Sequence, residues 1–276
     1  MLPILFGIEN FEVKMRLVFH KYHGTGNDFI LIDNRMNIFN PDEKIISALC
    51  RRRLGIGADG LMVLTNHPEA DFEMKYYNAD GKEGTMCGNG GRCMAAFAAF
   101  LNIIDLETTF MAVDGIHKAK LVAESGNITE VSLKMQDVPV IRQADNYFLI
   151  DTGSPHYVEF VHDIDDIDIY EKGKKIRWDK RFQPEGLNVN FVEVTESGLK
   201  VVTFERGVED VTLSCGTGVT ASALAASVLD GKDAGYYDVA TAGGNLSVRF
   251  KKEDGKFTDI WLEGPAKRVF SGEVGI

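Results

Sequence analysis

A short cysteine motif that occurs twice constrains the fold of this chain more than any other feature. The first copy is Cys87-Gly88-Asn89-Gly90 and the second is Cys215-Gly216-Thr217-Gly218. Each copy follows a stretch typical of a β-strand and runs into an alanine-rich segment typical of a helix. The two cysteines lie 128 residues apart, close to half of the 276-residue chain. The pattern therefore predicts two similar domains, each with one cysteine at a helix N-terminus.

Short apolar and alternating stretches predict that strands fill most of the remaining chain. A helix is expected to begin at Pro41 or Asp42 and to end near Leu49. Strands are expected in residues 16–33 (two strands around the loop Gly24–Asp28), 61–64, 72–77, 110–113, 117–123, 128–135, 147–151, 157–161, 189–194, 200–204, 237–240, 246–250 and 257–262.

The two cysteine helices are apolar nearly all round, which predicts burial on every side. Their small alanine side chains would let surrounding strands approach closely. We therefore expect an α+β fold of two pseudo-symmetric domains. Each would be a curved, mostly antiparallel sheet wrapped round a central alanine-rich helix, with the active site in the cleft between the domains.

The expected domain boundaries follow from this duplication. The N-terminal domain would comprise residues 15–136, joined by a C-terminal return at 264–276, and the second domain would comprise residues 137–263. Residues 1–14 would be an N-terminal extension, because the compact pattern begins at Met15. With no long linker between them, the two halves are expected to pack against each other.

Composition narrows the classes of partner. The net charge is −11 and the only basic cluster is Arg51-Arg52-Arg53, which disfavours nucleic acid. No apolar run reaches the length of about 18 residues that a membrane helix needs. The brief apolar stretch Leu2–Ile8 lacks the features of a signal peptide. Four cysteines without a disulfide-scaffold spacing indicate reduced thiols, so we expect a cytoplasmic protein.

A thiol at a helix N-terminus lies next to unpaired N–H groups and the positive end of the helix dipole. Both are expected to lower the pKa of Cys87 and Cys215 below the usual value of about 8.5. Gly88 and Gly216 would let the backbone approach a carboxylate ligand. Two such thiols facing one substrate could act as base and acid. The alternative is a pair of buried structural cysteines, which the duplication disfavours.

Other motifs favour structural interpretations. Cys93 and Cys50 are expected in the core, and the spacing of Cys87 and Cys93 does not fit a common zinc site, so we expect no metal. Gly55–Gly60 formally matches a dinucleotide fingerprint. It leads into a strand rather than a helix, so we interpret it as a turn.

Taken together, six motifs resemble those of the diaminopimelate epimerase family, in order and over the chain from about Met15 to its end. They are Gly24–Phe29, Gly55–Asp59, Asn78–Gly81, Cys87–Cys93, Glu205–Gly207 and Cys215–Gly218. The resemblance implies an isomerase that converts LL-2,6-diaminopimelate to the meso isomer without pyridoxal phosphate or metal. It also implies a place in lysine and peptidoglycan precursor biosynthesis, and a homodimer.

The resemblance also implies roles for particular residues. Cys87 and Cys215 match the acid and base thiols, and His156 and Glu205 match residues that assist them. The positions that match substrate contacts are Asn27, Asn78, Gly88, Asn89, Ser154, Asn188, Glu205, Arg206, Gly216 and Thr217. Of these, Arg206 suits a carboxylate because a guanidinium binds it through two hydrogen bonds.

Two positions depart from the family pattern. Many members have asparagine where this chain has Ser154, whose shorter side chain can still form hydrogen bonds. Some members have glutamine where Gly60 stands.

Two other functions remain open at this point: a racemase or epimerase of another amino acid, such as proline, and a non-catalytic or thiol-redox protein on the same fold.

Overall fold

The computed structural model describes residues 15–276, so the predicted N-terminal extension, residues 1–14, lies outside the described residues. The helices are α1 (Glu43–Cys50), α2 (Gly88–Phe100), α3 (Ile169–Arg177), α4 (Gly216–Asp230) and the short 3-10 helix η1 (Lys180–Phe182). None of the helices within residues 15–276 has the length and apolar character of a membrane span.

Strands make up most of the rest of the chain. The first seven are β1 (Arg16–Gly24), β2 (Asn27–Asp33), β3 (Gly60–Thr65), β4 (Phe72–Asn78), β5 (Glu107–Ala112), β6 (Gly115–Ser125) and β7 (Ile128–Lys134). The other nine are β8 (Ile141–Gln143), β9 (Phe148–Asp151), β10 (Pro155–Val161), β11 (Asn188–Thr195), β12 (Gly198–Glu205), β13 (Asp210–Thr212), β14 (Ala234–Thr241), β15 (Gly244–Glu253) and β16 (Lys256–Gly275).

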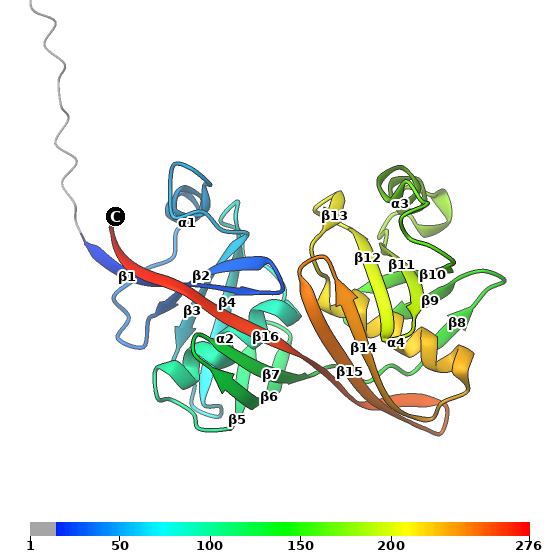
Figure 1. Cartoon of the computed structure of the whole chain (residues 1–276). Helices are drawn as coiled ribbons and strands as arrows, with labels where there is room; N and C mark the ends of the chain where they lie inside the picture. Colours follow the sequence, from blue (N-terminus) through cyan, green and yellow to red (C-terminus); the bar gives the residue numbers. More distant parts are fainter. Residues whose placement is uncertain (1–14) are drawn as a thin grey trace, which may run out of the picture.

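The chain forms two lobes, each built round one alanine-rich helix (Figure 1). In the first lobe the strands follow one another from β1 to β7, and β16 pairs with both β7 and β1 and so closes the ring. In the second lobe the order runs from β16 through β15, β14, β12, β11, β10 and β9 to β8. The predicted two-domain α+β fold is confirmed.

The two lobes repeat one pattern of strand pairing. Of the strand pairs, four are parallel: β2–β3 and β4–β5 in the first lobe, and β10–β11 and β12–β14 in the second. In each lobe, one parallel pair encloses the cysteine helix along the chain, α2 or α4, and the other encloses a shorter helix, α1 or α3. The remaining pairs are antiparallel, as predicted.

Helix α3 is an element that the sequence analysis missed. It begins at Ile169, 126 residues after α1 begins at Glu43, so it is the second copy of α1. Its sequence is strongly charged and carries Gly173, which hides the helical pattern. Gly173 packs against Phe204 of β12 so closely that an added Cβ would lie 2.6 Å from the phenylalanine Cβ.

The two cysteine helices are buried, as their apolar sequences predict. Residues 88–98 of α2 are all buried, and so is nearly all of α4 from Gly216 to Ser227. The hydroxyl groups of α4 remain satisfied inside the core because they donate to the helix itself, as Thr220 does to the Gly216 carbonyl at 2.9 Å. One apolar cluster contains residues of both helices and of the strands around them.

Strand β16 joins the lobes. Its first part pairs with β15 of the second lobe, Gly264–Lys267 pair with β7, and the last residues pair with β1 (Figure 1). A single strand is therefore shared by the two sheets, which together form one continuous 16-stranded sheet. The residue boundaries of the two domains stay a prediction.

Candidate active site

The N-termini of α2 and α4 face each other between the lobes. Cys87 and Cys215 are the N-cap residues, and neither side chain caps its helix. A Cβ built on Gly216 would lie 3.7 Å from the Gly88 Cα and 2.9 Å from Cδ2 of Leu262. A methyl group at Gly216 would therefore already touch the backbone of Gly88 and crowd Leu262, so the glycines of the duplicated motif let the two helix N-termini come into contact.

The other helices show what is special about these two N-termini. Asp42 caps α1 and Asp168 caps α3, each by accepting hydrogen bonds from first-turn N–H groups. At α2 and α4 a thiol occupies the N-cap position. Backbone N–H groups of Asn89 and Gly90 point at the Cys87 sulfur, and that of Gly218 points at the Cys215 sulfur.

The predicted lowering of the thiol pKa is wrong for both cysteines. Burial raises the pKa of Cys87, and it raises the pKa of Cys215 to about 12. The backbone N–H groups oppose this effect but are outweighed, and the negative charge of Glu205 raises both values further. The sequence reveals the helix N-terminus, whereas the depth of burial depends on the meeting of two lobes.

Cys87 contacts Asn27, at the start of β2. The thiol donates to the Asn27 Oδ1 at 3.5 Å, and the Asn89 side-chain amide points at the same oxygen at 3.5 Å. The Asn27 amide group donates to the Asp59 carboxylate at 2.8 Å, which fixes its orientation. Two of the predicted substrate contacts, Asn27 and Asn89, therefore lie beside the first thiol.

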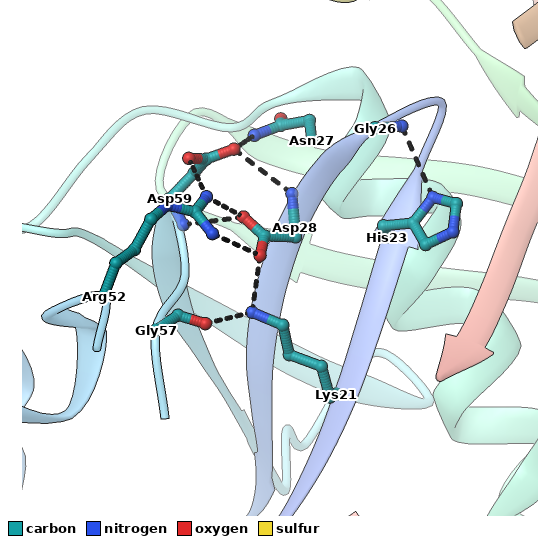
Figure 2. Close-up of polar contacts among 8 residues, drawn as sticks. All are labelled: Lys21, His23, Gly26, Asn27, Asp28, Arg52, Gly57 and Asp59. Atoms are coloured by element: carbon teal, nitrogen blue, oxygen red, sulfur yellow. Dashed lines mark hydrogen bonds and ion pairs between the residues drawn. The ribbon is translucent and has the colours of Figure 1, made fainter. Parts of the chain in front are cut away.

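A charged cluster supports Asn27 from behind (Figure 2). Arg52 bridges the carboxylates of Asp28 and Asp59 at 2.6 and 2.8 Å, and Lys21 pairs with Asp28 at 2.7 Å. Burial by itself would raise the pKa of Asp28, but hydrogen bonds from Arg52 and Lys21 hold it below the usual value. Lys21 also donates to the carbonyl of Gly57.

This cluster explains the glycine-rich segment Gly55–Gly60. The segment is a turn that delivers Asp59 and leads into β3, so the structural interpretation is confirmed. Gly60 is tightly enclosed, since an added Cβ would lie 2.4 Å from the Tyr76 ring and 2.6 Å from the Tyr77 carbonyl oxygen. Tyr76 thus fills the space into which a longer side chain at this position would extend.

Cys215 contacts a second set of polar groups. Its sulfur lies 3.4 Å from the Thr217 hydroxyl, which lies 3.4 Å from the Ser154 hydroxyl. The Thr217 carbonyl accepts a hydrogen bond from Thr152 at 2.9 Å, which ties the start of α4 to the loop after β9. Ser154 therefore occupies a place beside the second thiol despite its short side chain.

His156 is fully enclosed behind Ser154. Its Nε2 lies 3.0 Å from the Ser154 hydroxyl and its Nδ1 lies 3.1 Å from the side-chain amide of Asn190. Burial, together with the positive charge of Arg206, lowers the pKa of His156 to about 3. The imidazole is therefore neutral at physiological pH, and no hydrogen bond joins it directly to Cys87 or Cys215.

The Asn188 side chain links the loop of Ser154 to the end of β12. Its amide donates to the Ser154 hydroxyl at 3.1 Å and to the Pro155 carbonyl at 3.3 Å. Its Oδ1 accepts from the Arg206 backbone N–H at 2.9 Å. The Arg206 guanidinium donates to the Glu185 carbonyl at 3.0 Å and pairs with no carboxylate among residues 15–276.

The negative charge of Glu205, at the end of β12, raises the pKa of both thiols. Burial raises the pKa of its own carboxyl, and the charge of Asp59 adds to the effect.

Asn78 differs from the other expected contacts. It is exposed at the end of β4, and its side chain makes no hydrogen bond within the described part of the chain.

Sequence reasoning missed Arg92 and Asn190. Arg92 is fully buried within α2, and its guanidinium donates to the Asn89 Oδ1 at 2.9 Å and to the Gly88 carbonyl at 3.4 Å. It has no carboxylate partner among residues 15–276, and its charge lowers the pKa of Cys87. An arginine inside an alanine-rich helix was the available signal. Asn190, in the middle of β11, carried no signal beyond its polarity in an apolar strand.

The same described residues contain no group of three or more histidine, cysteine or acidic side chains arranged to hold a metal ion. Cys50 and Cys93 are buried in apolar clusters, as expected. The polar groups of the site are therefore two thiols, helix N–H groups, amides, hydroxyls, Glu205 and two guanidinium groups.

A family model for diaminopimelate epimerase matches residues 19–138 and 148–269. The chain belongs to the diaminopimelate epimerase family. The predicted family and the predicted isomerase class are thereby confirmed. A diaminopimelate epimerase of Flavobacterium psychrophilum is 47% identical over 91% of this chain and 97% of the relative. One of Chlorobaculum tepidum is 42% identical over 91% of this chain and 98% of the relative.

Solved structures share the fold of this diaminopimelate epimerase family member at low identity. A phenazine biosynthesis protein of the PhzF family from Bacillus anthracis has a TM-score of 0.73 at 13% identity, with 95% of this chain and 100% of that chain covered. A hydroxyproline epimerase from Agrobacterium vitis has a TM-score of 0.68 at 13% identity, with 95% and 93% covered. At such identities the likeness concerns the fold alone.

The lowered pKa of His156 predicts an acid-dependent loss of stability. A histidine kept neutral in the folded state gains its proton only in the unfolded state, so stability falls as pH drops below about 6.5. With a folded-state pKa of about 3, this one group should lower the free energy of unfolding by about 2 kcal/mol between pH 7 and pH 5. Urea unfolding at the two pH values measures it.

The variant His156→Gln should lack this share of the pH dependence, whereas His162→Gln, at an exposed position, should keep it. Equal pH dependence in wild type and His156→Gln would show that His156 is not kept neutral.

Proposed function

We propose that this protein converts LL-2,6-diaminopimelate to meso-diaminopimelate by proton transfer between the substrate α-carbon and two thiols, Cys87 and Cys215. The observation that carries the proposal is the meeting, across Gly88 and Gly216, of two helix N-termini whose N-cap residues are cysteines. Family membership supports the same substrate, since the matching relatives are named diaminopimelate epimerases.

The chemistry requires stabilisation of a carbanion, because an amino acid α-hydrogen is a very weak acid. Preorganised N–H groups in a water-poor site can provide it. In this proposal the backbone amides of Gly88-Asn89 and Gly216-Thr217 hold the reacting α-carboxylate. One thiolate removes the α-hydrogen while the opposite thiol delivers another proton, and the centre is inverted. The scheme needs neither pyridoxal phosphate nor a metal ion.

The raised thiol pKa values fit this reaction. A thiolate that forms in a buried site is a stronger base than one in water, since its conjugate acid holds the proton more tightly. The cost of forming it is reduced by the N–H groups of Asn89, Gly90 and Gly218. Cys87 is half-buried and Cys215 is buried, so the substrate itself would complete the exclusion of water.

The distant end of the substrate carries a second carboxylate and ammonium group. We assign the carboxylate to Arg206, whose guanidinium charge has no carboxylate partner in the described chain and whose backbone N–H is bound by Asn188. Asn78, as the family resemblance implies, would help to bind this end. Asn27 and Glu205 lie nearer the thiols. Binding energy at the distant end would position the reacting carbon between the sulfur atoms.

His156 assists in this proposal as a neutral group that orients Ser154, and not as an ionised acid or base. The support is its pKa of about 3 and its two hydrogen bonds, to Ser154 and Asn190. Ser154 then takes the role that asparagine has in many family members, at the edge of the site beside Thr217.

A second candidate is epimerisation of a cyclic amino acid, because a hydroxyproline epimerase has a similar fold. The unpaired charge of Arg206 favours a substrate with a second carboxylate. A thiol-redox or binding protein on this fold would catalyse no exchange at the α-carbon.

We also propose that the protein is a cytoplasmic homodimer that acts in lysine and peptidoglycan precursor biosynthesis, as the family resemblance implies.

The function predicts exchange of the substrate α-hydrogen with solvent. Incubation of LL- and meso-diaminopimelate with the protein in heavy water should place deuterium at the α-carbon, because a thiol that receives a solvent deuteron delivers it on the opposite face. Mass spectrometry and NMR detect the label. Proline and hydroxyproline serve as controls and should stay unlabelled. Labelling of proline alone would support the cyclic substrate, and labelling of none would exclude epimerisation.

Replacement of either thiol by serine should abolish epimerisation and leave the fold intact. A hydroxyl is far too weak a base at neutral pH to remove the α-hydrogen, and it fits in the space of the thiol. The measurement is kcat for Cys87→Ser and Cys215→Ser, with circular dichroism as the check of folding. Cys93→Ala, in the buried part of α2, is the matched control and should remain active. Near-normal turnover in either serine variant would rule out the two-thiol scheme.

Loss of the Arg206 guanidinium should weaken catalysis through substrate binding. Arg206→Met keeps most of the apolar stem of the side chain. Loss of the charge-assisted contact to the distant carboxylate should weaken transition-state binding by roughly 2–5 kcal/mol, measured as a fall in kcat/KM. Arg181→Met, at an exposed arginine paired with Asp179, is the matched control. A loss of less than about tenfold in kcat/KM, which is ~1.4 kcal/mol, would return Arg206 to a structural role.

A further inference from the structure

The polar side chains behind the second thiol form a chain of hydrogen bonds whose direction can be worked out. The chain runs from β12, β11 and β10 to the N-terminus of α4. Its members, in order, are Thr203, Asn190, His156, Ser154, Thr217 and Cys215.

Asn190 determines which nitrogen of His156 carries the proton. The Asn190 amide donates to the Tyr157 carbonyl at 2.9 Å, and since a carbonyl can only accept, this contact fixes the orientation of the amide. The same NH₂ group therefore also donates to His156 Nδ1 at 3.1 Å. Thr203 donates to the Asn190 Oδ1 at 2.8 Å, and Gly218 leaves room for that oxygen, since an added Cβ would lie 2.2 Å from it.

With Nδ1 as an acceptor, the neutral His156 ring carries its proton on Nε2 and donates it to the Ser154 hydroxyl at 3.0 Å. Asn188 donates to the same oxygen at 3.1 Å. The orientation of Asn188 is set by the Arg206 N–H on its Oδ1 and by the Pro155 carbonyl. Both lone pairs of the Ser154 oxygen are therefore occupied.

A hydroxyl whose two lone pairs are occupied must use its own proton as a donor. The remaining partner of Ser154 is the Thr217 hydroxyl at 3.4 Å. Thr217 then accepts from Ser154 and donates to the Cys215 sulfur at 3.4 Å. Every bond in the chain thus points its hydrogen towards the sulfur of Cys215, and a donor to sulfur stabilises the thiolate.

Backbone N–H groups point at both sulfur atoms, from Asn89 and Gly90 at Cys87 and from Gly218 at Cys215. The two thiols differ in their side-chain contacts, and that of Cys87 has the opposite sense. The Asn27 Oδ1, which lies 3.5 Å from the Cys87 sulfur, can only accept, so the contact requires the proton to be on sulfur. The Asp59 carboxylate holds the Asn27 amide in this orientation, and Arg52 holds Asp59 (Figure 2). A fixed acceptor beside a thiol stabilises the protonated form.

The charged and titratable groups around the thiols do not reverse this order. The charge of Glu205 of β12 raises the pKa of both thiols. Arg92 of α2 favours ionisation of Cys87, but it is bound to Asn89 and Gly88 and not to the sulfur. Tyr76 of β4, which is partly buried, and Cys93 of α2, which is buried, have raised pKa values and remain neutral. His156 remains neutral as well.

We propose that the two thiols are polarised before substrate binds: when the pair holds one proton, that proton lies on Cys87 and Cys215 is the thiolate. Ser154, Thr217, His156 and Asn190 are the positioning residues that set this order. The inference rests on the proposed function. The singly protonated pair removes the α-hydrogen that faces Cys215. The Cα–H bond breaks as the S–H bond of Cys215 forms, and the S–H bond of Cys87 breaks as its proton moves to the opposite face of the carbon. The charge of the pair is unchanged.

The test measures how readily each thiol ionises. Alkylation by iodoacetamide proceeds through the thiolate, so below the pKa its rate is proportional to the ionised fraction. Rates for Cys87 and Cys215 are followed separately by peptide mass spectrometry at pH 8, and each variant is compared with wild type at the same cysteine. This comparison cancels the difference in exposure between the two thiols.

Thr217→Val removes the donor to Cys215 at nearly constant volume, and it should slow alkylation of Cys215 about tenfold, which corresponds to a pKa higher by about one unit. Alkylation of Cys87 should not slow. Asn27→Leu removes the acceptor and should speed alkylation of Cys87. Thr217→Ser should restore the rate at Cys215. Thr220→Val, which removes an α4 hydroxyl bonded only to the Gly216 carbonyl, is the matched control.

A second readout is the pH dependence of kcat/KM with diaminopimelate. Its acidic limb should move up by about one pH unit in Thr217→Val and Ser154→Ala, and return in Thr217→Ser. Equal effects on the two thiols, or no effect at Cys215 together with unchanged pH profiles, would overturn the proposal. A failure of the proposed function alone would give another result. Wild-type protein would then show no α-deuterium exchange, while alkylation would still be slower at Cys215 in Thr217→Val and faster at Cys87 in Asn27→Leu.

Discussion

The approach of two helix N-termini is the interaction on which the rest of this structure depends. Helices α2 and α4 meet at Gly88 and Gly216, and both are buried along most of their length. Alanine-rich sequences let the strands of each lobe close round the helices, and the shared strand β16 holds the lobes together. Each part of the fold therefore serves to place two cysteines opposite each other.

The same burial sets the chemistry of the site. A helix N-terminus favours a thiolate, but in this protein desolvation outweighs that effect and raises the pKa of both thiols. The thiolates are therefore strong bases, and which thiol ionises depends on the hydrogen bonds to each sulfur. The Tyr157 carbonyl fixes the direction of those bonds on the side of Cys215, and Asp59 and Arg52 fix it on the side of Cys87.

Much of the fold follows from local sequence, and the exceptions have physical reasons. Most strands, α1 and the two cysteine helices lie where alternation, turns and apolar periodicity predict them. The short strands β8 and β13 and the part of β16 beyond Leu262 were not predicted as strands. Helix α3 was not predicted, because its charged sequence and Gly173 hide the helical pattern. The internal duplication held the missing information, since α3 is the counterpart of α1. At Gly60 the sequence could not show that Tyr76 fills the adjoining space.

The sequence by itself determined that there are two thiols at helix N-termini, the family, and the turns that carry Asn27, Ser154 and Asn188. Those features depend on local chemistry and spacing. Only the tertiary structure decided the burial of the thiols, the neutrality of His156 and the opposite hydrogen-bond environments of Cys87 and Cys215. These properties arise from groups more than 30 residues apart in the chain, such as His156 with Asn190 and Asn27 with Asp59, and no local pattern contains them.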